Sequence, residues 1–130
     1  MKKTIKPQWA LLSLAAFAML ASAPSSHADG FVAGKVELVR VFDAQLFPGW
    51  GPPASTFWFS LTGVTTLGSC QAWASGKIPF VSQNKEQLAL VLSAQLADKQ
   101  ISVYYTDSQT VSGYCRAGII TPGDPPPAGF

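Results

Sequence analysis

Residues 31–42 read FVAGKVELVRVF, and this stretch decides the fold. Val36 and Leu38 alternate with charged residues, which is the two-residue period of a β-strand. The phase then slips, because Val39 and Val41 become the apolar pair. Two apolar neighbours at a phase change predict a β-bulge, which allows one long strand to bend and to serve both sides of a small barrel.

Four more stretches downstream have the alternation of β-strands. In residues 56–62, Phe57, Phe59 and Leu61 share one face and Trp58 lies on the other. The remaining strands are expected at residues 69–75, 101–106 and 111–120, with a turn at 106–110. In the last of them, Cys115, Ala117 and Ile119 share the inward phase.

A helix is expected between the third and fourth strands. Ser82 or Asn84 can cap its start, and Glu86 places a negative charge in the first turn, where the helix dipole favours it. The helix should end near Lys99. The apolar stripe expected to face the core consists of Leu88, Val91, Leu92 and Leu96.

The order β-β-β-α-β-β, with a bulged first strand, is that of the OB-fold, a five-stranded Greek-key barrel. We therefore predict a mainly β fold of this kind, with a small β-sandwich as the competing architecture. In an OB-fold the third and fifth strands are neighbours. Cys70 on the third strand and Cys115 on the fifth then face each other. The prediction of the barrel and the prediction of a Cys70–Cys115 disulfide therefore support one another.

The beginning of the chain has the pattern of a cleaved leader. Lys2, Lys3 and Lys6 precede the uncharged stretch WALLSLAAFAMLASA at 9–23, and Ser26 and Ala28 are the small residues that signal peptidase requires. The predicted organisation is a signal peptide at 1–28, a barrel domain at 29–121 and a Pro-rich C-terminal tail at 122–130. The predicted location is periplasmic or secreted, without a membrane anchor after cleavage.

Compartment and charge narrow the functional classes. Export favours a structural disulfide between Cys70 and Cys115, because an oxidising compartment promotes the pairing of two cysteines. In the chain-entropy model this bond stabilises the fold by about 4 kcal/mol. Residues 29–130 carry six basic and seven acidic side chains and no histidine. Such a near-neutral domain lacks the basic surface of nucleic-acid-binding proteins. The residue types also predict no metal site, no cofactor and no enzyme, since a Ser-His-Asp or Cys-His system needs an imidazole.

The outward face of the second and third strands is the candidate binding surface. Trp58 and Trp73 lie there beside Ser60 and Gln71, and Tyr104 extends the surface. Exposed tryptophan beside hydroxyl and amide groups suits stacking on a sugar ring or packing against a protein. The alternative is that the Pro-rich loop at 47–55 or the C-terminal tail covers both indoles, which would make them structural.

Several segments together carry a family resemblance. They are the helix SQNKEQLALVLSAQLADKQ at 82–100, ISVYY at 101–105, GYCRAGI at 113–119, and upstream FWFSL at 57–61 and SCQAWA at 69–74. This pattern resembles small exported OB-fold proteins that include the receptor-binding B subunits of AB5 toxins, especially subtilase cytotoxin B.

The resemblance implies a non-catalytic subunit that forms a pentamer and binds glycans. The sialic-acid-binding relatives have a Tyr/Ser-rich segment before the first strand, whereas this chain has DGFVAGK at 29–35, so no glycan-site residue is carried over. The alternative function is a monomeric periplasmic structural or inhibitor-like protein whose loop at 47–55 binds a protein partner.

Overall fold

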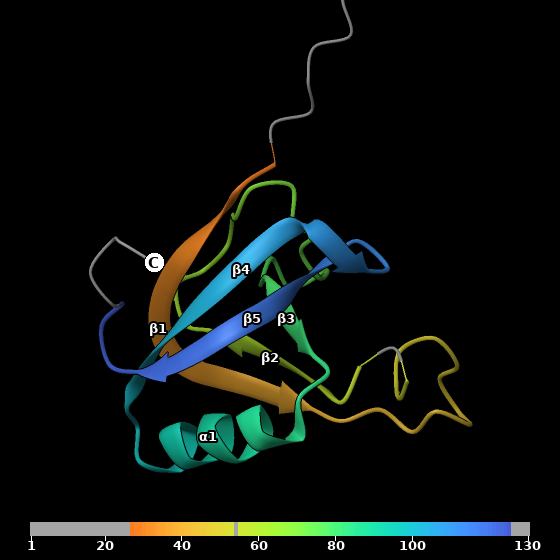
Figure 1. The fold of residues 1–130 in the computed structure, drawn as a ribbon, viewed down its shortest axis with the longest axis horizontal. Helices are drawn as coiled ribbons and strands as arrows, with labels where there is room; N and C mark the ends of the chain where they lie inside the picture. Colours follow the sequence, from red (N-terminus) through yellow and green to blue (C-terminus); the bar gives the residue numbers. More distant parts are fainter. Residues whose placement is uncertain (1–26, 54, 126–130) are drawn as a thin grey trace, which may run out of the picture.

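In the computed structural model, which describes residues 27–53 and 55–125, five strands form one sheet that closes into a ring (Figure 1). The mainly β fold with one helix is therefore confirmed. Of the predicted leader only residues 27 and 28 are described, and residues 126–130 of the predicted tail lie outside the described part. The elements in chain order are β1 (Asp29–Arg40), β2 (Phe57–Leu61), β3 (Pro79–Ser82), α1 (Lys85–Leu96), β4 (Gln100–Val111) and β5 (Tyr114–Pro122).

β1 closes the ring because it pairs with a different strand along each half. Its first half runs antiparallel to β4, from Asp29 opposite Thr106 to Lys35 opposite Gln100. Its second half runs antiparallel to β2, and the register shifts between Val36 and Leu38. The predicted bulge is confirmed, although it lies just before the Leu38–Val39 phase change rather than at it. The order around the ring is β1-β2-β3-β5-β4, and β3 and β5 are neighbours as expected.

The third strand is displaced from its predicted position. Residues 69–75 form turns and irregular backbone, and the strand is the fully buried segment Pro79–Ser82 instead. The alternation in CQAWAS is carried by alanines, which have low strand propensity, whereas Phe80 and Val81 are strong strand formers. Proline at the first position of a strand costs no essential ladder bond, so Pro79 does not prevent the pairing with β2.

The β4–β5 hairpin turns later than predicted. β4 continues through 106–110 with a register irregularity, and the turn is Ser112–Gly113, with φ of 52° and 86°. Positive φ at both central residues is the geometry of a tight hairpin turn. A second irregularity pairs Tyr104 with Ile119 and Tyr105 with Ala117. The extra residue between them reverses the phase of β5, so Ile120 packs on the core and Ile119, predicted to face inward, is exposed.

α1 covers one end of the barrel (Figure 1). Its predicted cap is confirmed at Asn84, whose Oδ1 accepts a hydrogen bond from the Glu86 N–H at 2.8 Å. Val91 is fully buried, and Leu88 and Ala94 pack partly against the core. Leu96 is 89% exposed and Leu92 is also exposed, so the predicted stripe is wrong at both positions. The helix residues that contact the core lie three positions apart, beginning at Leu88, so Leu92 and Leu96 face solvent.

Two apolar clusters organise the molecule. The inner core fills the ring and includes Phe57, Phe59 and Leu61 of β2, all on the predicted inward face. The Cys70–Cys115 disulfide belongs to this core and is confirmed, with a Cα–Cα distance of 5.3 Å, although Cys70 lies in the β2–β3 connection rather than on a strand. The outer cluster lies on the opposite face of β2 and consists of Trp58, Val81, Val111 and Tyr114, with Phe42, Trp50 and Trp73 packed against it.

Candidate functional site

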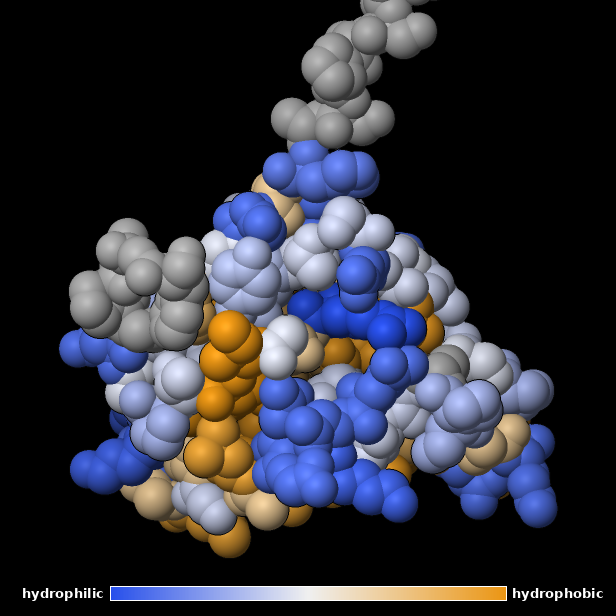
Figure 2. Space-filling view, in the orientation of Figure 1, coloured by the Kyte–Doolittle hydropathy of each residue, from blue (hydrophilic) through white to orange (hydrophobic). Residues whose placement is uncertain are grey.

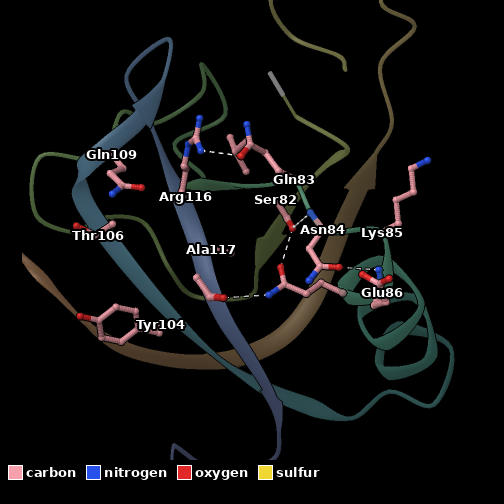
Figure 3. A pocket seen from close by; sticks show the side chains of 13 residues that line it. Ser82, Gln83, Asn84, Lys85, Glu86, Tyr104, Thr106, Gln109, Arg116 and Ala117 are labelled. Carbon is pink, nitrogen blue, oxygen red and sulfur yellow. Dashed lines mark hydrogen bonds between the residues drawn. The ribbon is translucent and has the colours of Figure 1, made fainter. Parts of the chain in front are cut away.

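A polar pocket of about 600 Å³ lies where β3 ends and α1 begins (Figure 3). β4 and β5 supply its other wall. In Figure 2, hydrophilic surface gathers on this face beside the start of α1. The side chains that line it are mostly amides and hydroxyls, with one aromatic ring and one guanidinium: Ser82, Gln83, Asn84, Gln87, Tyr104, Thr106, Gln109 and Arg116, together with Lys85 and Glu86.

A chain of hydrogen bonds fixes the helix side of this polar pocket. The Asn84 N–H donates to Ser82 Oγ at 3.1 Å, and Ser82 Oγ donates to Gln87 Oε1 at 2.7 Å. The amide nitrogen of Gln87 then donates to the Gly118 carbonyl at 3.0 Å. Because Gly118 belongs to β5, these bonds fasten the first turn of α1 to the sheet and set the shape of the pocket wall.

Arg116 provides the positive charge on the sheet side. It lies on β5 opposite Val81 of β3, and its Nη1 donates to Gln83 Oε1 at 2.8 Å. Its Nε is buried without a hydrogen-bond partner among the described residues. None of the ion pairs within 27–53 and 55–125 involves Arg116. Its guanidinium contacts the neutral amide of Gln83 and lines the pocket.

Tyr104 lies at the far end of the pocket from α1 (Figure 3). Its hydroxyl donates to Asp29 Oδ2 at 2.8 Å, and its ring meets Phe31 edge to face with centroids 5.3 Å apart. The hydrogen bond to the Asp29 carboxylate raises the pKa of Tyr104 above its ordinary value, and burial and the charge of Asp29 act in the same direction. The phenol therefore stays protonated and remains a hydrogen-bond donor well into the alkaline range.

The structure brings Trp58 and Trp73 together, as their predicted faces implied, but it does not expose both. The two indole rings are stacked, with centroids 6.1 Å apart and an interplanar angle of 9°. Trp58 is 0% exposed. Trp50 stacks on it at 5.3 Å, and Trp58 Nε1 donates to Ser55 Oγ at 2.7 Å and to the Trp50 carbonyl at 3.1 Å. For Trp58 the structure therefore bears out the structural alternative and not an exposed binding residue, because the loop between β1 and β2 folds over it.

The other predicted binding residues are dispersed. Ser60 is also fully buried on β2, and its hydroxyl has no partner among the described residues. Gln71 is exposed, and its backbone N–H donates to the Gly113 carbonyl at the β4–β5 turn. Tyr104 lines the polar pocket instead of the indole surface. Of the five residues, Trp73, Gln71 and Tyr104 can reach a ligand, and they do so at different places.

A second, smaller hollow opens at Trp73. It measures about 370 Å³ and is lined by Arg40, Trp50, Trp73, Ala74 and Ser75. The guanidinium carbon of Arg40 lies 4.5 Å from the Trp73 ring centre, which is a cation–π contact. Glu37 of the same strand pairs with Lys77, and Arg40 covers the indole.

The polar pocket was not found from the sequence. The segment at 82–87 predicts a helix cap, and that interpretation is right, but its concentration of amides also marks a polar surface. Arg116 comes to lie beside this segment only through the parallel pairing of β3 with β5. That pairing could not be predicted while the third strand was expected at residues 69–75. Within the described residues no three His, Cys, Asp or Glu side chains gather closely enough to hold a metal ion.

Comparison of the chain with protein-family models, with curated proteins and with solved structures found no match. No helix in the described part of the chain is long and apolar enough to cross a membrane. The function must therefore be inferred from the geometry.

Proposed function

We propose that this chain is an exported, non-catalytic recognition protein of the OB-fold type, and that its polar pocket binds a glycan. The ring order β1-β2-β3-β5-β4 and the position of α1 between β3 and β4 support the OB-fold assignment. The disulfide in a small domain supports an oxidising compartment.

The composition of the polar pocket is the observation that carries the glycan assignment. Sugar hydroxyls both donate and accept hydrogen bonds, and the pocket offers amides, hydroxyls and a guanidinium within one hollow. Tyr104 adds a ring with an apolar face at one end, suited to the C–H face of a sugar. A few placed polar groups in a concave site are what fix the orientation of a small ligand.

The same lining supports binding rather than hydrolysis. Glu86 is the one carboxylate among the lining residues, whereas a glycosidase needs a pair of carboxylates that flank the scissile bond. The sequence from residue 29 onward contains no histidine to act as a general base near neutral pH.

The test is a glycan array probed with the oxidised 29–130 chain, followed by calorimetry on any hit. We expect Arg116→Gln to weaken binding about tenfold or more, because a charged hydrogen bond contributes about 1.5–3 kcal/mol. Arg40→Gln is the matched control, since Arg40 lies at the indole hollow, and it should leave the affinity unchanged. A folded protein that binds no glycan, or equal losses in both variants, would refute the assignment.

A protein partner is the second candidate, and the surface of the β1–β2 loop favours it. Leu46 is 75% exposed and Phe47 51% exposed, and they belong to the same loop as Trp50, which lines the hollow beside Arg40 and Trp73. Tryptophan and arginine dominate the energetics of protein interfaces. The solution mass from light scattering separates the two candidates. A pentamer supports the glycan-binding subunit that the toxin resemblance implies, and a monomer supports the inhibitor-like protein whose loop binds a protein partner.

A further inference from the structure

Asp107 is a buried carboxylate that plays no part in the proposed glycan site. Its side chain is 3% exposed, and both of its oxygens accept hydrogen bonds. Oδ2 accepts from the backbone N–H and the hydroxyl of Ser69, each at 3.0 Å. Oδ1 accepts from the Ala28 N–H at 2.8 Å, and His27 Nδ1 lies 3.4 Å from it. Thus one oxygen is held by the β2–β3 connection and the other by the residues that precede β1.

The surroundings fit closely around this contact. The Asp107 N–H donates to the Ala28 carbonyl at 3.0 Å, so Ala28 is bound through both of its backbone groups. A Cβ on Gly68 would lie 2.7 Å from the Ala28 Cβ and 2.7 Å from Asp107 Oδ2, at a φ of +50°. Only glycine leaves room there for the beginning of the chain to reach Asp107.

Removal of the leader after Ala28 would take away every donor to Oδ1. Hydrolysis splits the Ala28–Asp29 bond with one water: the Ala28 carbonyl carbon gains the hydroxyl and leaves as a carboxylate with His27, and the Asp29 nitrogen gains the hydrogen. That nitrogen then takes up a proton to become an ammonium at neutral pH. Cleavage also removes Ala28 and His27 from around Oδ1, so this oxygen takes its next donor either from water or from the new amine, and a nearby cation is the stronger donor of the two.

We propose that Asp107 is the binding site for the amino terminus that processing creates, with the α-ammonium of Asp29 taking the place of the Ala28 N–H on Oδ1. Asp29 is paired with Thr106, the neighbour of Asp107 on β4. The new cation therefore needs to move by about one residue spacing, roughly 3.3 Å, along a strand end that cleavage has freed. A charge-assisted bond replaces a neutral one, which makes the processed end the more firmly held.

The charged groups that face this amine are Asp107 and the side-chain carboxylate of Asp29 itself, which the Tyr104 hydroxyl binds. His27 departs with the leader. Both remaining charges are negative, so they favour the protonated amine, and the contribution of Asp107 can be separated by substitution. The proposal depends on cleavage after Ala28 and is independent of what the polar pocket binds.

The test follows the Cα chemical shift of Asp29 by NMR from about pH 6 to 10, in the chain that begins at Asp29. We expect the pKa of its α-ammonium to lie about one unit above the ordinary value of about 7.7–8.0. Asp107→Asn should return it toward that value. Ser69→Ala is the control, because it removes a bond to Oδ2 and keeps the carboxylate, so the pKa should stay raised.

A chain that begins at His27 keeps the proposal falsifiable if Asp107→Asn does not fold. There the Ala28 N–H still occupies Oδ1, so the pKa of the terminal ammonium should rise less than that of the Asp29 ammonium, and an equal rise would contradict the proposal. An ordinary pKa for the amine of Asp29, a shift that survives Asp107→Asn, or a mature protein that begins upstream of Ala28 would each overturn the proposal.

Discussion

Trp58 lies on the outer face of the barrel and yet has no exposed surface. Its ring is stacked with Trp50 and with Trp73, and Tyr114 meets it edge to face at 5.0 Å. A buried indole needs a partner for its N–H, and Ser55 and the Trp50 carbonyl supply one. The β1–β2 loop is therefore packed on β2 through this residue, and the two outer rings of the stack, Trp50 and Trp73, remain partly exposed.

Substituting the two tryptophans should separate their roles. Trp58→Ala leaves a large cavity and removes the indole N–H that donates to Ser55 Oγ and to the Trp50 carbonyl, so we expect a loss of about 3–5 kcal/mol in the free energy of unfolding. Trp73→Ala removes a half-exposed ring and should cost about 1 kcal/mol. Urea denaturation measures both. Equal losses would mean that Trp73 is as deeply packed as Trp58, and a tolerated Trp58→Ala would mean that the loop is not fixed on β2.

At the level of elements, the features that depend on neighbouring residues in the chain were predicted correctly. The bulge in β1, the inward face of β2 and the Asn84 cap all follow from neighbours along the chain, and the structure confirms them. β3 could not be located in this way. Its pairing with β2 and β5 makes Pro79–Ser82 fully buried, which favours a short continuous apolar run without alternation.

The candidate site was predicted less well than the fold, because it depends on contacts between distant segments. Trp58 was placed on the correct face, but the sequence left open whether the 47–55 loop covers it, and only the stacking of Trp50 on its ring decides this. The polar pocket joins Gln83 to Arg116 across the β3–β5 contact. Neither residue has a local pattern that marks a site, so the pocket is a property of the assembled barrel.

The helix offers a prediction at this scale. Val91 is fully buried against the barrel and Leu96 is 89% exposed, although both belong to the predicted apolar stripe. Val91→Ala should cost about 2 kcal/mol in unfolding free energy, through lost burial and a cavity. Leu96→Gln should change it by no more than about 0.5 kcal/mol. Thermal unfolding of the two variants measures this, and a large loss for Leu96→Gln would mean that another surface covers it in solution.

At the scale of the whole molecule, the disulfide joins two parts that the sheet alone does not connect. Cys70 lies in the long β2–β3 connection, and Cys115 lies on β5, with a sequence separation of 45. This connection contains short turns and irregular backbone rather than paired strand, and it also carries Ser69, a partner of Asp107. The disulfide therefore restrains a long segment of the ring that lacks ladder hydrogen bonds.

Removing the disulfide should consequently destabilise the whole barrel rather than one loop. Closing a loop of this length stabilises the folded state by about 4 kcal/mol in the chain-entropy model, a large part of the stability of a small domain. We expect the Cys70→Ala/Cys115→Ala variant to show a single unfolding transition at much lower urea concentration than the oxidised protein. The reduced wild-type chain is the matched control, since it keeps both sulfur atoms in the core and loses only the bond. If reduction left the midpoint unchanged, the β2–β3 connection would be held by its packing alone; if the double variant fell well below the reduced chain, the buried sulfur of Cys115 would contribute mainly through packing.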